Sequence, residues 1–266
     1  MSLPSLSTAP GTFVRRVMGS RKILRWLPRN LKLGDPVLQF FLNGFGKTTR
    51  YTFVNFPSLY APGTAHSCIY DLVLHDALGS IAARATIEVP VAGTADVVLG
   101  DVMRTPLPEL GILSARIRSP RHFDYSDRHL GTVRSFFYAA YHDQAMRSIS
   151  VIHPQTAKYS SRPDRPTWRS NMLLWPSRVN SFELLLMNPT TVDAVTDLRL
   201  VAGNGEIVAS SAATIPPFGA RRVVWESAPL RQYPYVSVSA DMLAAPNAKP
   251  LVFLNFDNGA FSAAHS

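Results

Sequence analysis

The residues best suited to chemistry gather in one stretch of the chain, Arg116 to Arg134. It holds two histidines and two aspartates within eight positions, together with five arginines and a tyrosine. Imidazole nitrogens and carboxylate oxygens are ligands for divalent metals, whereas guanidinium groups bind carboxylates or phosphates through paired hydrogen bonds. With the nearby His142, the candidate binding residues are Arg116, Arg118, Arg121, His122, Asp124, Tyr125, Asp127, Arg128, His129 and His142.

Three interpretations of this stretch stay open. A metal-binding interpretation uses His122, Asp124, Asp127 and His129 as ligands, although their spacing matches no established metal motif. In the second, the arginines bind an anionic ligand or a partner. In the third, the charges pair with one another in a solvated loop, as surface charge clusters usually do. We therefore expect no cofactor, with one divalent metal as the alternative.

Enzyme motifs are absent from the sequence. It contains no Gly-x-Ser-x-Gly elbow, no His-Glu-x-x-His and no glycine-rich dinucleotide fingerprint. Gly44 to Thr49 (GFGKTT) ends like a phosphate-binding loop, but Phe41 stands where that motif needs its first glycine. The residues after it alternate like a strand, so we predict a hairpin turn there.

His142 is the remaining candidate for acid/base chemistry. A four-residue turn over 143–146 would place it opposite Arg147, with His153 six residues further along the same strand. Six strand residues span about 20 Å, which is too far for His142 and His153 to share a metal. An enzyme site would therefore lie at the 116–143 end of its domain.

An internal repeat determines the fold prediction. Shifted by 126 positions, Asp71–Val98 aligns with Asp197–Val224 without a gap, and ten of the 28 aligned residues are identical. In each copy an alternating strand leads into a glycine turn, a second strand, a proline, a second glycine and a third strand. Glycine supplies the positive φ of tight turns, and Asn204-Gly205 is a favoured type I′ pair. Each copy is predicted to be an antiparallel meander.

Short strands at regular spacing flank both copies, about seven to each unit, as in a β-sandwich. We expect an all-β protein with two tandem immunoglobulin-like β-sandwich domains that arose by internal duplication. The predicted boundaries are residues 35–158 for the first sandwich, with an inserted loop at 116–134, residues 159–165 for a proline-containing linker, and residues 166–262 for the second sandwich.

A basic amphipathic arm is predicted over residues 1–34. It carries seven of the 27 basic side chains and no acidic one, while apolar residues interleave with the arginines. Such a segment, partly helical, attaches proteins to an anionic membrane surface or to a partner, or serves as a targeting segment. The residues expected to make this attachment are Arg15, Arg16, Arg21, Lys22, Arg25 and Trp26.

Composition narrows the location and the partners. Arginines interrupt every apolar stretch of the arm, and no apolar run approaches the ~18 residues that span a bilayer, so we expect neither a secretory signal nor a transmembrane segment. The lone Cys68 excludes an intrachain disulfide and suits an intracellular protein, with peripheral membrane attachment as an option. Outside the arm the charge is nearly balanced, which disfavours nucleic acid as a partner and leaves the oligomeric state open.

Two functional hypotheses follow. The first is a non-enzymatic binding or accessory protein of two sandwiches, attached by its arm and specific through the 116–134 loop. The alternative is a metal- or acid/base-dependent enzyme with its site at the 116–143 end of the first sandwich.

Overall fold

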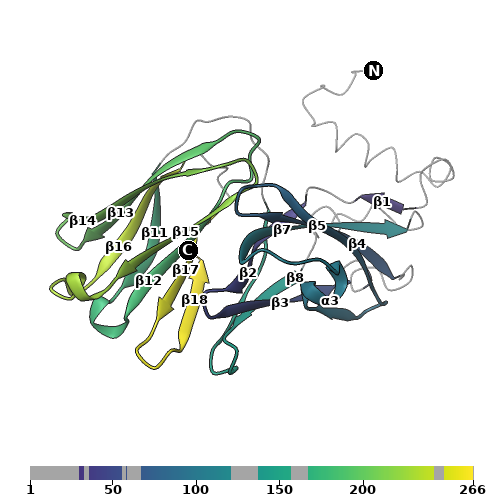
Figure 1. Cartoon of the computed structure of the whole chain (residues 1–266), viewed down its shortest axis with the longest axis horizontal. Helices are drawn as coiled ribbons and strands as arrows, with labels where there is room; N and C mark the ends of the chain where they lie inside the picture. The colour runs from purple at the N-terminus through teal and green to yellow at the C-terminus, as the bar shows by residue number, and fades with distance from the viewer. Residues whose placement is uncertain are drawn as a thin grey trace, which may run out of the picture.

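The computed structural model describes residues 30–32, 36–55, 58, 67–120, 137–156, 167–242 and 249–265. These residues form an almost entirely β protein with antiparallel sheets, in agreement with the prediction (Figure 1). The strands of the first half are β1 (Asn30–Lys32), β2 (Val37–Gly44), β3 (Lys47–Val54), β4 (Cys68–Asp76), β5 (Ile81–Val89), β6 (Thr94–Val97), β7 (Leu110–Pro120), β8 (Phe137–His142), β9 (Ile149–Ile152) and β10 (Gln155–Thr156). Those of the second half are β11 (Thr167–Leu174), β12 (Ser181–Met187), β13 (Ala194–Ala202), β14 (Ile207–Ile215), β15 (Ala220–Glu226), β16 (Val236–Met242), β17 (Leu251–Asn255) and β18 (Phe261–His265). The helical elements are α3 (Leu99–Met103), η3 (Pro176–Arg178) and η4 (Ala228–Leu230).

The first half is a sandwich folded from one continuous sheet. One layer has the order β5-β4-β7-β2 and the other the order β6-β3-β8-β9, while β1 lies beside β7 and β10 beside β2. The β2–β3 hairpin joins the layers, with Gly44 paired to Lys47. Both turn residues, Phe45 and Gly46, have a positive φ. The predicted hairpin turn at 44–49 is thus confirmed.

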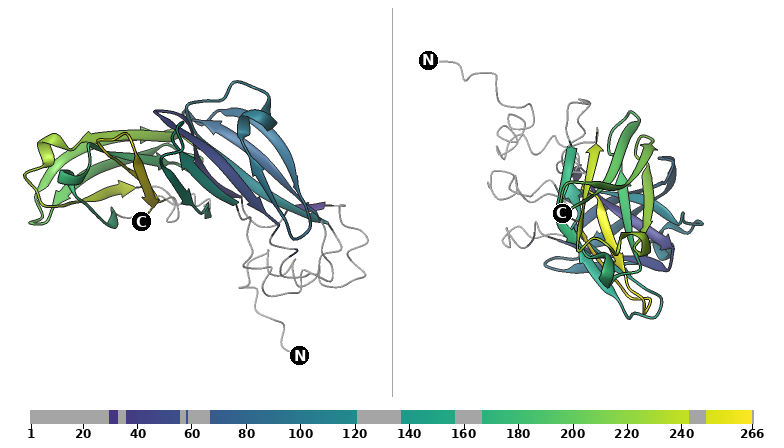
Figure 2. Two further views of the ribbon diagram at one scale, coloured as in Figure 1. Left: turned by 90° about the horizontal axis from the view of Figure 1, so that it is seen from below. Right: turned by 90° about the vertical axis from the view of Figure 1, so that its left-hand side faces the viewer.

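The second half repeats this arrangement strand for strand. Its layers have the orders β14-β13-β16-β11 and β15-β12-β17-β18. The pairing register agrees as well, because Cys68 faces Val89 in β4–β5 and Ala194 faces Ile215 in β13–β14, a shift of 126 positions for both partners. Figures 1 and 2 show the two sandwiches side by side along the long axis of the molecule.

The predicted meander is wrong for the third strand of each copy. β6 pairs with β3 and β15 with β12, so each crosses to the opposite layer instead of continuing the sheet that β4–β5 or β13–β14 began. The prolines before these strands, Pro90 and Pro216, each begin the turn that makes this crossing: the N–H of Gly93 bonds to Pro90 O and that of Gly219 to Pro216 O.

The strand order also differs from the immunoglobulin order at the edges. In an immunoglobulin domain the second and fifth strands pair, the third and sixth pair, and the first strand joins the second. Here the two central pairs are present as β3–β6 and β4–β7. The first strand, β2, pairs mainly with β7, and the seventh, β8, pairs with β3. First and last strands have therefore exchanged layers.

The β4–β5 and β13–β14 turns have the same backbone conformation at glycine, and it is not the type I′ turn that Asn204-Gly205 predicts. In each turn the glycine, Gly79 or Gly205, has a positive φ, and its N–H bonds to the carbonyl three residues earlier. Asn204 does not have a positive φ, so the turn is not type I′. Gly79 is required for a second reason, since a Cβ there would lie 1.9 Å from the carbonyl oxygen of Pro217 in the other half.

The hydrophobic core of the first half extends into the second half across a contact that we call the seam. Strands β12 and β17 are buried on both faces: Leu184 and Val252 pack inside the second sandwich, whereas Leu185 and Phe253 belong to the core cluster of the first. A strand buried on both faces has apolar side chains at most of its positions, as β12 has in the sequence SFELLLM. The seam therefore resembles a domain interior.

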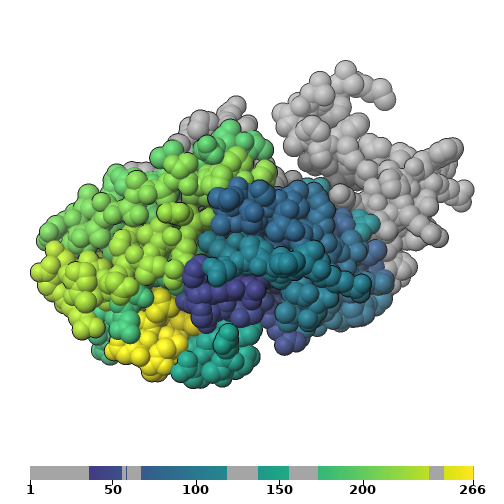
Figure 3. All heavy atoms as spheres, viewed as in Figure 1, coloured from purple at the N-terminus to yellow at the C-terminus, as the bar shows by residue number. Residues whose placement is uncertain are grey.

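Two edge strands meet at the seam. The hydroxyls of Ser148 and Ser150, beside or on β9, accept hydrogen bonds of 2.9 Å from the backbone N–H groups of Phe261 and Ala263 on β18. In Figure 3 the yellow C-terminal strands lie directly against the purple and teal strands of the first half. Side chains thus satisfy backbone donors that an exposed edge would leave open.

A buried charge lies within this apolar contact. The Glu183 side chain on β12 is completely buried, with Lys47 Nζ of the first half 2.9 Å from Oε2 and Arg222 Nε 2.9 Å from Oε1. Burial opposes ionisation, but the hydrogen bonds from Arg222 and the charge of Lys47 hold the pKa of the Glu183 carboxyl below its usual value. Lys47 also lies 5.0 Å from the ring centroid of Phe253. This ion pair fixes the β2–β3 hairpin on the second sandwich.

Several predicted segments lie outside the described residues, namely positions 1–29 of the arm, 121–134 of the loop and the linker 159–165. The end of the predicted arm is a strand, because Asn30–Lys32 pairs with β7 as β1. In the part of the chain that the structure describes, no helix has the length and apolarity needed to cross a membrane.

Replacing Glu183 with glutamine will test the buried ion pair. Glu183→Gln leaves Lys47 and Arg222 without their anion, and breaking a buried pair from one side costs about 3–5 kcal/mol. Urea unfolding of the full chain measures this loss. Glu226→Gln, which removes an exposed carboxylate at the end of β15, is the control and should change stability by less than about 0.5 kcal/mol. Equal effects of the two variants would show that the pair does not stabilise the seam.

Candidate functional site

The structure places three of the ten predicted binding residues, and they do not converge. Arg116 and Arg118 lie on β7, and His142 ends β8 in the opposite layer. The other seven lie outside the described residues, as do the six arm residues: Arg121, His122, Asp124, Tyr125, Asp127, Arg128 and His129 in the loop, and Arg15, Arg16, Arg21, Lys22, Arg25 and Trp26 in the arm.

The predicted loop begins later than residue 116. Residues 116–120 continue β7. Arg116 stands opposite Asp71, and Arg118 stands opposite Ile69, on the neighbouring strand β4. The burial alternates, with Ala115 and Ile117 in the core and the two arginines on the outer face. The period-two pattern of this segment indicates a strand, so the predicted bounds of 116–134 for the inserted loop are wrong at their start.

A groove of about 590 Å³ runs over this outer face, and it is the candidate site. It crosses strands β5, β4 and β7 and is closed at one side by the residue before β2. Its lining residues are Pro36, Asp71, Leu72, Val73, Arg84, Ala85, Thr86, Ser114 and Arg116. Three of them carry charge, two bear hydroxyl groups, and Val73 forms part of the floor. Of the three predicted binding residues that the structure describes, only Arg116 lines the groove.

The charged residues of the groove differ in whether they form ion pairs. Asp71 forms an ion pair with Arg118, whose Nη2 lies 2.8 Å from Oδ1. Arg84 and Arg116 form no ion pair with any carboxylate of the described residues. Arg84 is exposed and Arg116 is half-buried. The groove therefore offers two guanidinium groups, each with several donors directed to solvent or to a ligand.

The corresponding face of the second half lacks these arginines. In the alignment shifted by 126 positions, Arg84 corresponds to Ser210 and Thr86 corresponds to Ala212. In the first half Arg116 stands opposite Asp71. In the second half the residue opposite Asp197 is Asp241. The fold is the same in both halves, so it does not require arginine at these positions.

Arg84 and Thr86 are among the groove residues that the sequence analysis missed. The signal was present in the repeat itself, since β5 and β14 align without a gap and differ at the outward positions 84, 86 and 88. Comparing outward-facing positions between the copies, instead of counting identities, identifies them.

The predicted geometry around His142 is wrong. His142 faces Ile149, not Arg147, so the turn spans six residues. The reason is Asp143, whose Oδ1 accepts hydrogen bonds from the N–H groups of Arg147 (2.7 Å) and Ser148 (3.1 Å) and so widens the loop. Burial opposes ionisation of Asp143, yet these hydrogen bonds hold its pKa below the usual value.

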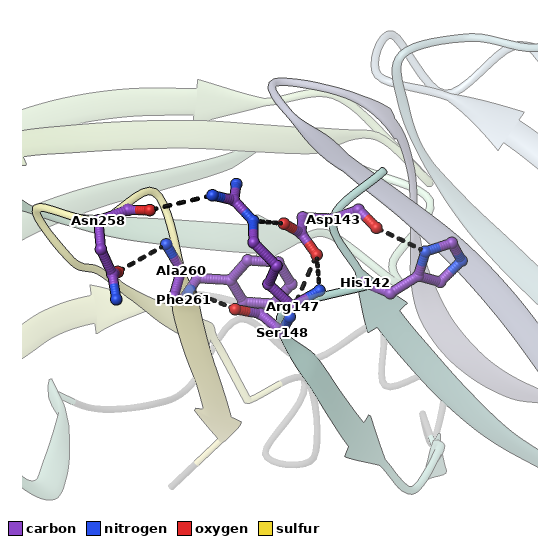
Figure 4. A network of polar contacts seen from close by, with 7 residues as sticks. All are labelled: His142, Asp143, Arg147, Ser148, Asn258, Ala260 and Phe261. Atoms are coloured by element: carbon purple, nitrogen blue, oxygen red, sulfur yellow. Dashed lines mark hydrogen bonds and ion pairs between the residues drawn. The ribbon is translucent and has the colours of Figure 1, made fainter. Parts of the chain in front are cut away.

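This turn belongs to the seam (Figure 4). Arg147 forms an ion pair with Asp143 at 2.9 Å and donates to the Asn258 carbonyl of the β17–β18 turn at 3.2 Å. The His142 ring contacts the Asp143 carbonyl oxygen through Nδ1 at 3.1 Å. The figure shows the ring on the far side of the turn from the β17–β18 hairpin. These contacts hold the two hairpins together.

Two other histidines meet at the seam. The rings of His153 and His265 lie edge to face with centroids 4.3 Å apart. Burial, followed by the positive charges of His153 and Lys249, lowers the pKa of His265 below 6.5. Across the ranges that the structure describes, no three His, Cys, Asp or Glu side chains lie close enough to form a metal site.

Comparison with known proteins gives no family. No family model matches the chain, and no curated protein matches it. Among solved structures it is similar to a β-glucuronidase from glycoside hydrolase family 2, with 10% identity and a TM-score of 0.19, and to a putative β-galactosidase from Bacteroides fragilis, with 8% identity and a TM-score of 0.20. Each match covers 88% of this chain but only 24% and 32%, respectively, of those larger proteins.

Lowering the pH should weaken the seam through His265. Because the folded-state pKa lies below the unfolded value, the unfolded chain binds more protons, and stability falls as the pH drops through about 6.5. Unfolding midpoints between pH 8 and pH 5 should therefore decline less steeply in His265→Gln than in the natural sequence. His142→Gln, which leaves the His153–His265 contact intact, is the control. A decline unchanged in His265→Gln would contradict the assignment.

Proposed function

We propose that this chain is a non-enzymatic binding or accessory protein built by tandem duplication of one β-sandwich. The first sandwich carries the binding face and the second holds it rigidly. Support for duplication comes from the aligned identities, the equal strand orders and the equal registers of the two halves. The ancestral sandwich would share the two central strand pairs of immunoglobulin domains, with its edge strands exchanged.

One observation carries the binding role: Arg84, Thr86 and Arg116 of the groove are replaced by other residue types in the second half, although the strand orders of the two halves agree. Positions that pack the core remain apolar in both copies, for example Leu72 and Leu198, or Leu74 and Leu200. Over the groove, in contrast, Arg84 and Thr86 correspond to Ser210 and Ala212. Exposed sheet faces are commonly polar, but here the polar residues differ between two faces of the same fold, and a binding role for the first face accounts for that difference.

The second sandwich supports that surface. The apolar seam and the buried Lys47–Glu183 pair prevent rotation about a linker, so the groove has a fixed orientation relative to the whole body. In this proposal the basic arm attaches the body to a protein partner or to an anionic membrane surface. Deleting residues 1–29, which spares β1, should then abolish attachment while leaving the unfolding transition unchanged.

Blocking the groove tests the binding role whatever the ligand is. Cys68 is buried and burial raises the pKa of its thiol to about 12, so an introduced surface cysteine can be labelled selectively. Thr86→Cys carrying a maleimide-linked polymer covers the groove, and Ala212→Cys with the same label covers the matching face of the second half. Both labelled chains are immobilised and exposed to extract of the source cells, and the eluted species are quantified by mass spectrometry.

We expect at least one species to be retained by the chain labelled at position 212 and lost from the chain labelled at position 86. Identical sets of retained species would reject the groove as the binding face.

A further inference from the structure

We infer that the groove recognises an oxyanion, a carboxylate, sulfate or phosphate group, held between Arg84 and Arg116. This inference rests on the proposed function and adds the ligand class. Among the side chains that the structure describes, five charged ones face this part of the sheet: Arg84, Arg116, Arg118, Asp71 and Glu88. Arg118 is engaged with Asp71, and Glu88 is exposed beyond the groove lining. The two lining arginines remain as a pair of cations.

The register places these arginines on either side of β4. Arg84 stands opposite Val73, and Arg116 stands opposite Asp71, two positions away on the same strand. Two strand spacings and two residues of rise separate their Cα atoms by roughly 12 Å. Both side chains are long enough to meet an oxyanion above Val73, where each guanidinium can form two hydrogen bonds to it.

Hydroxyl groups complete the other diagonal of the site. Thr86 stands opposite Asp71 on β5, and Ser114 stands opposite Val73 on β7. The four side chains Arg84, Thr86, Ser114 and Arg116 thus occupy the corners of a quadrilateral around β4, and every one of them can donate a hydrogen bond. Asp71 between them is already paired with Arg118, so its charge is offset.

The second half supplies an internal contrast. In the second half, Ser210 and Ser239 stand opposite Arg199 of β13 at the corresponding corners. Ala212 and Asp241 stand opposite Asp197. Both cations of the groove are lost, and one is replaced by an acid. Asp197 is again paired, in this case with Arg199 on its own strand. Oxyanion binding should therefore be confined to the first half.

Titration with inorganic phosphate, sulfate and acetate tests this inference on the full chain. Backbone and arginine Nε–H resonances are followed by NMR at constant ionic strength. We expect saturable shifts at residues 71–73, 84–86 and 114–116, and the anion that binds most tightly identifies the oxyanion. In Arg84→Gln/Arg116→Gln the affinity should fall roughly tenfold or more, because both cationic hydrogen-bond donors are removed.

Arg221→Gln removes one exposed arginine of the second half and is the control for loss of a positive charge outside the groove. Its affinity should equal that of the natural sequence, and the unfolding midpoints of all variants should agree. Shifts spread over surface arginines, or a double variant that binds as well as Arg221→Gln, would refute the oxyanion assignment.

The two tests separate the inference from the proposed function. Loss of a species on blocking position 86, without saturable oxyanion binding, would keep the binding face and reject the ligand class. Equal retention after blocking positions 86 and 212 would reject the binding face itself.

Discussion

The buried carboxylate of Glu183 is the interaction on which the arrangement of the whole molecule depends. A charge in an apolar contact is tolerated only when its partners are held in place, and here one partner comes from each side of the seam. Lys47 reaches it only because the β2–β3 hairpin turns within two residues, Phe45 and Gly46. The apolar strands around it provide most of the stabilisation, whereas the ion pair selects one relative position of the two sandwiches.

That fixed position bears on the proposed difference in role between the two sandwiches. Their cores and registers agree, but their outer sheet faces do not, and the groove is present in the half whose turn at Gly79 packs against Pro217 of the other. A sheet that bends or rotates would change the spacing of side chains on neighbouring strands. Because the seam fixes the first sandwich to the second one beside it, the proposed site on β5, β4 and β7 would keep Arg84 and Arg116 at constant separation.

Much of the fold could be predicted from local patterns. The alternation in β4 and β13, the glycine turns and the repeat gave the all-β class and the β4–β5 and β13–β14 hairpins, whose registers are local. The crossing of β6 and β15 between layers was not predictable in this way, because a strand carries no mark of which layer it joins. The seam had a visible sign in the continuous run SFELLLM, where a glutamate stands among leucines, but its partner Lys47 lies 136 residues earlier. The candidate site was missed for another reason. The charged residues of 121–134 are close together in the sequence, whereas Arg84 comes near Arg116 only through strand pairing.

The contact between β9 and β18 has a consequence for synthesis of the chain. Phe253 packs on Tyr141 with ring centroids 5.5 Å apart, and β18 satisfies its backbone donors through the serines beside β9. The first sandwich therefore completes its core only after residues 251–265 have left the ribosome. Until then its β9 edge and the apolar side of β2 face water, which are the features that chaperones recognise in nascent chains and that promote misassembly. Contacts of such long sequence separation also slow folding, so the time between translation and completion of the seam is when this protein is most exposed to aggregation.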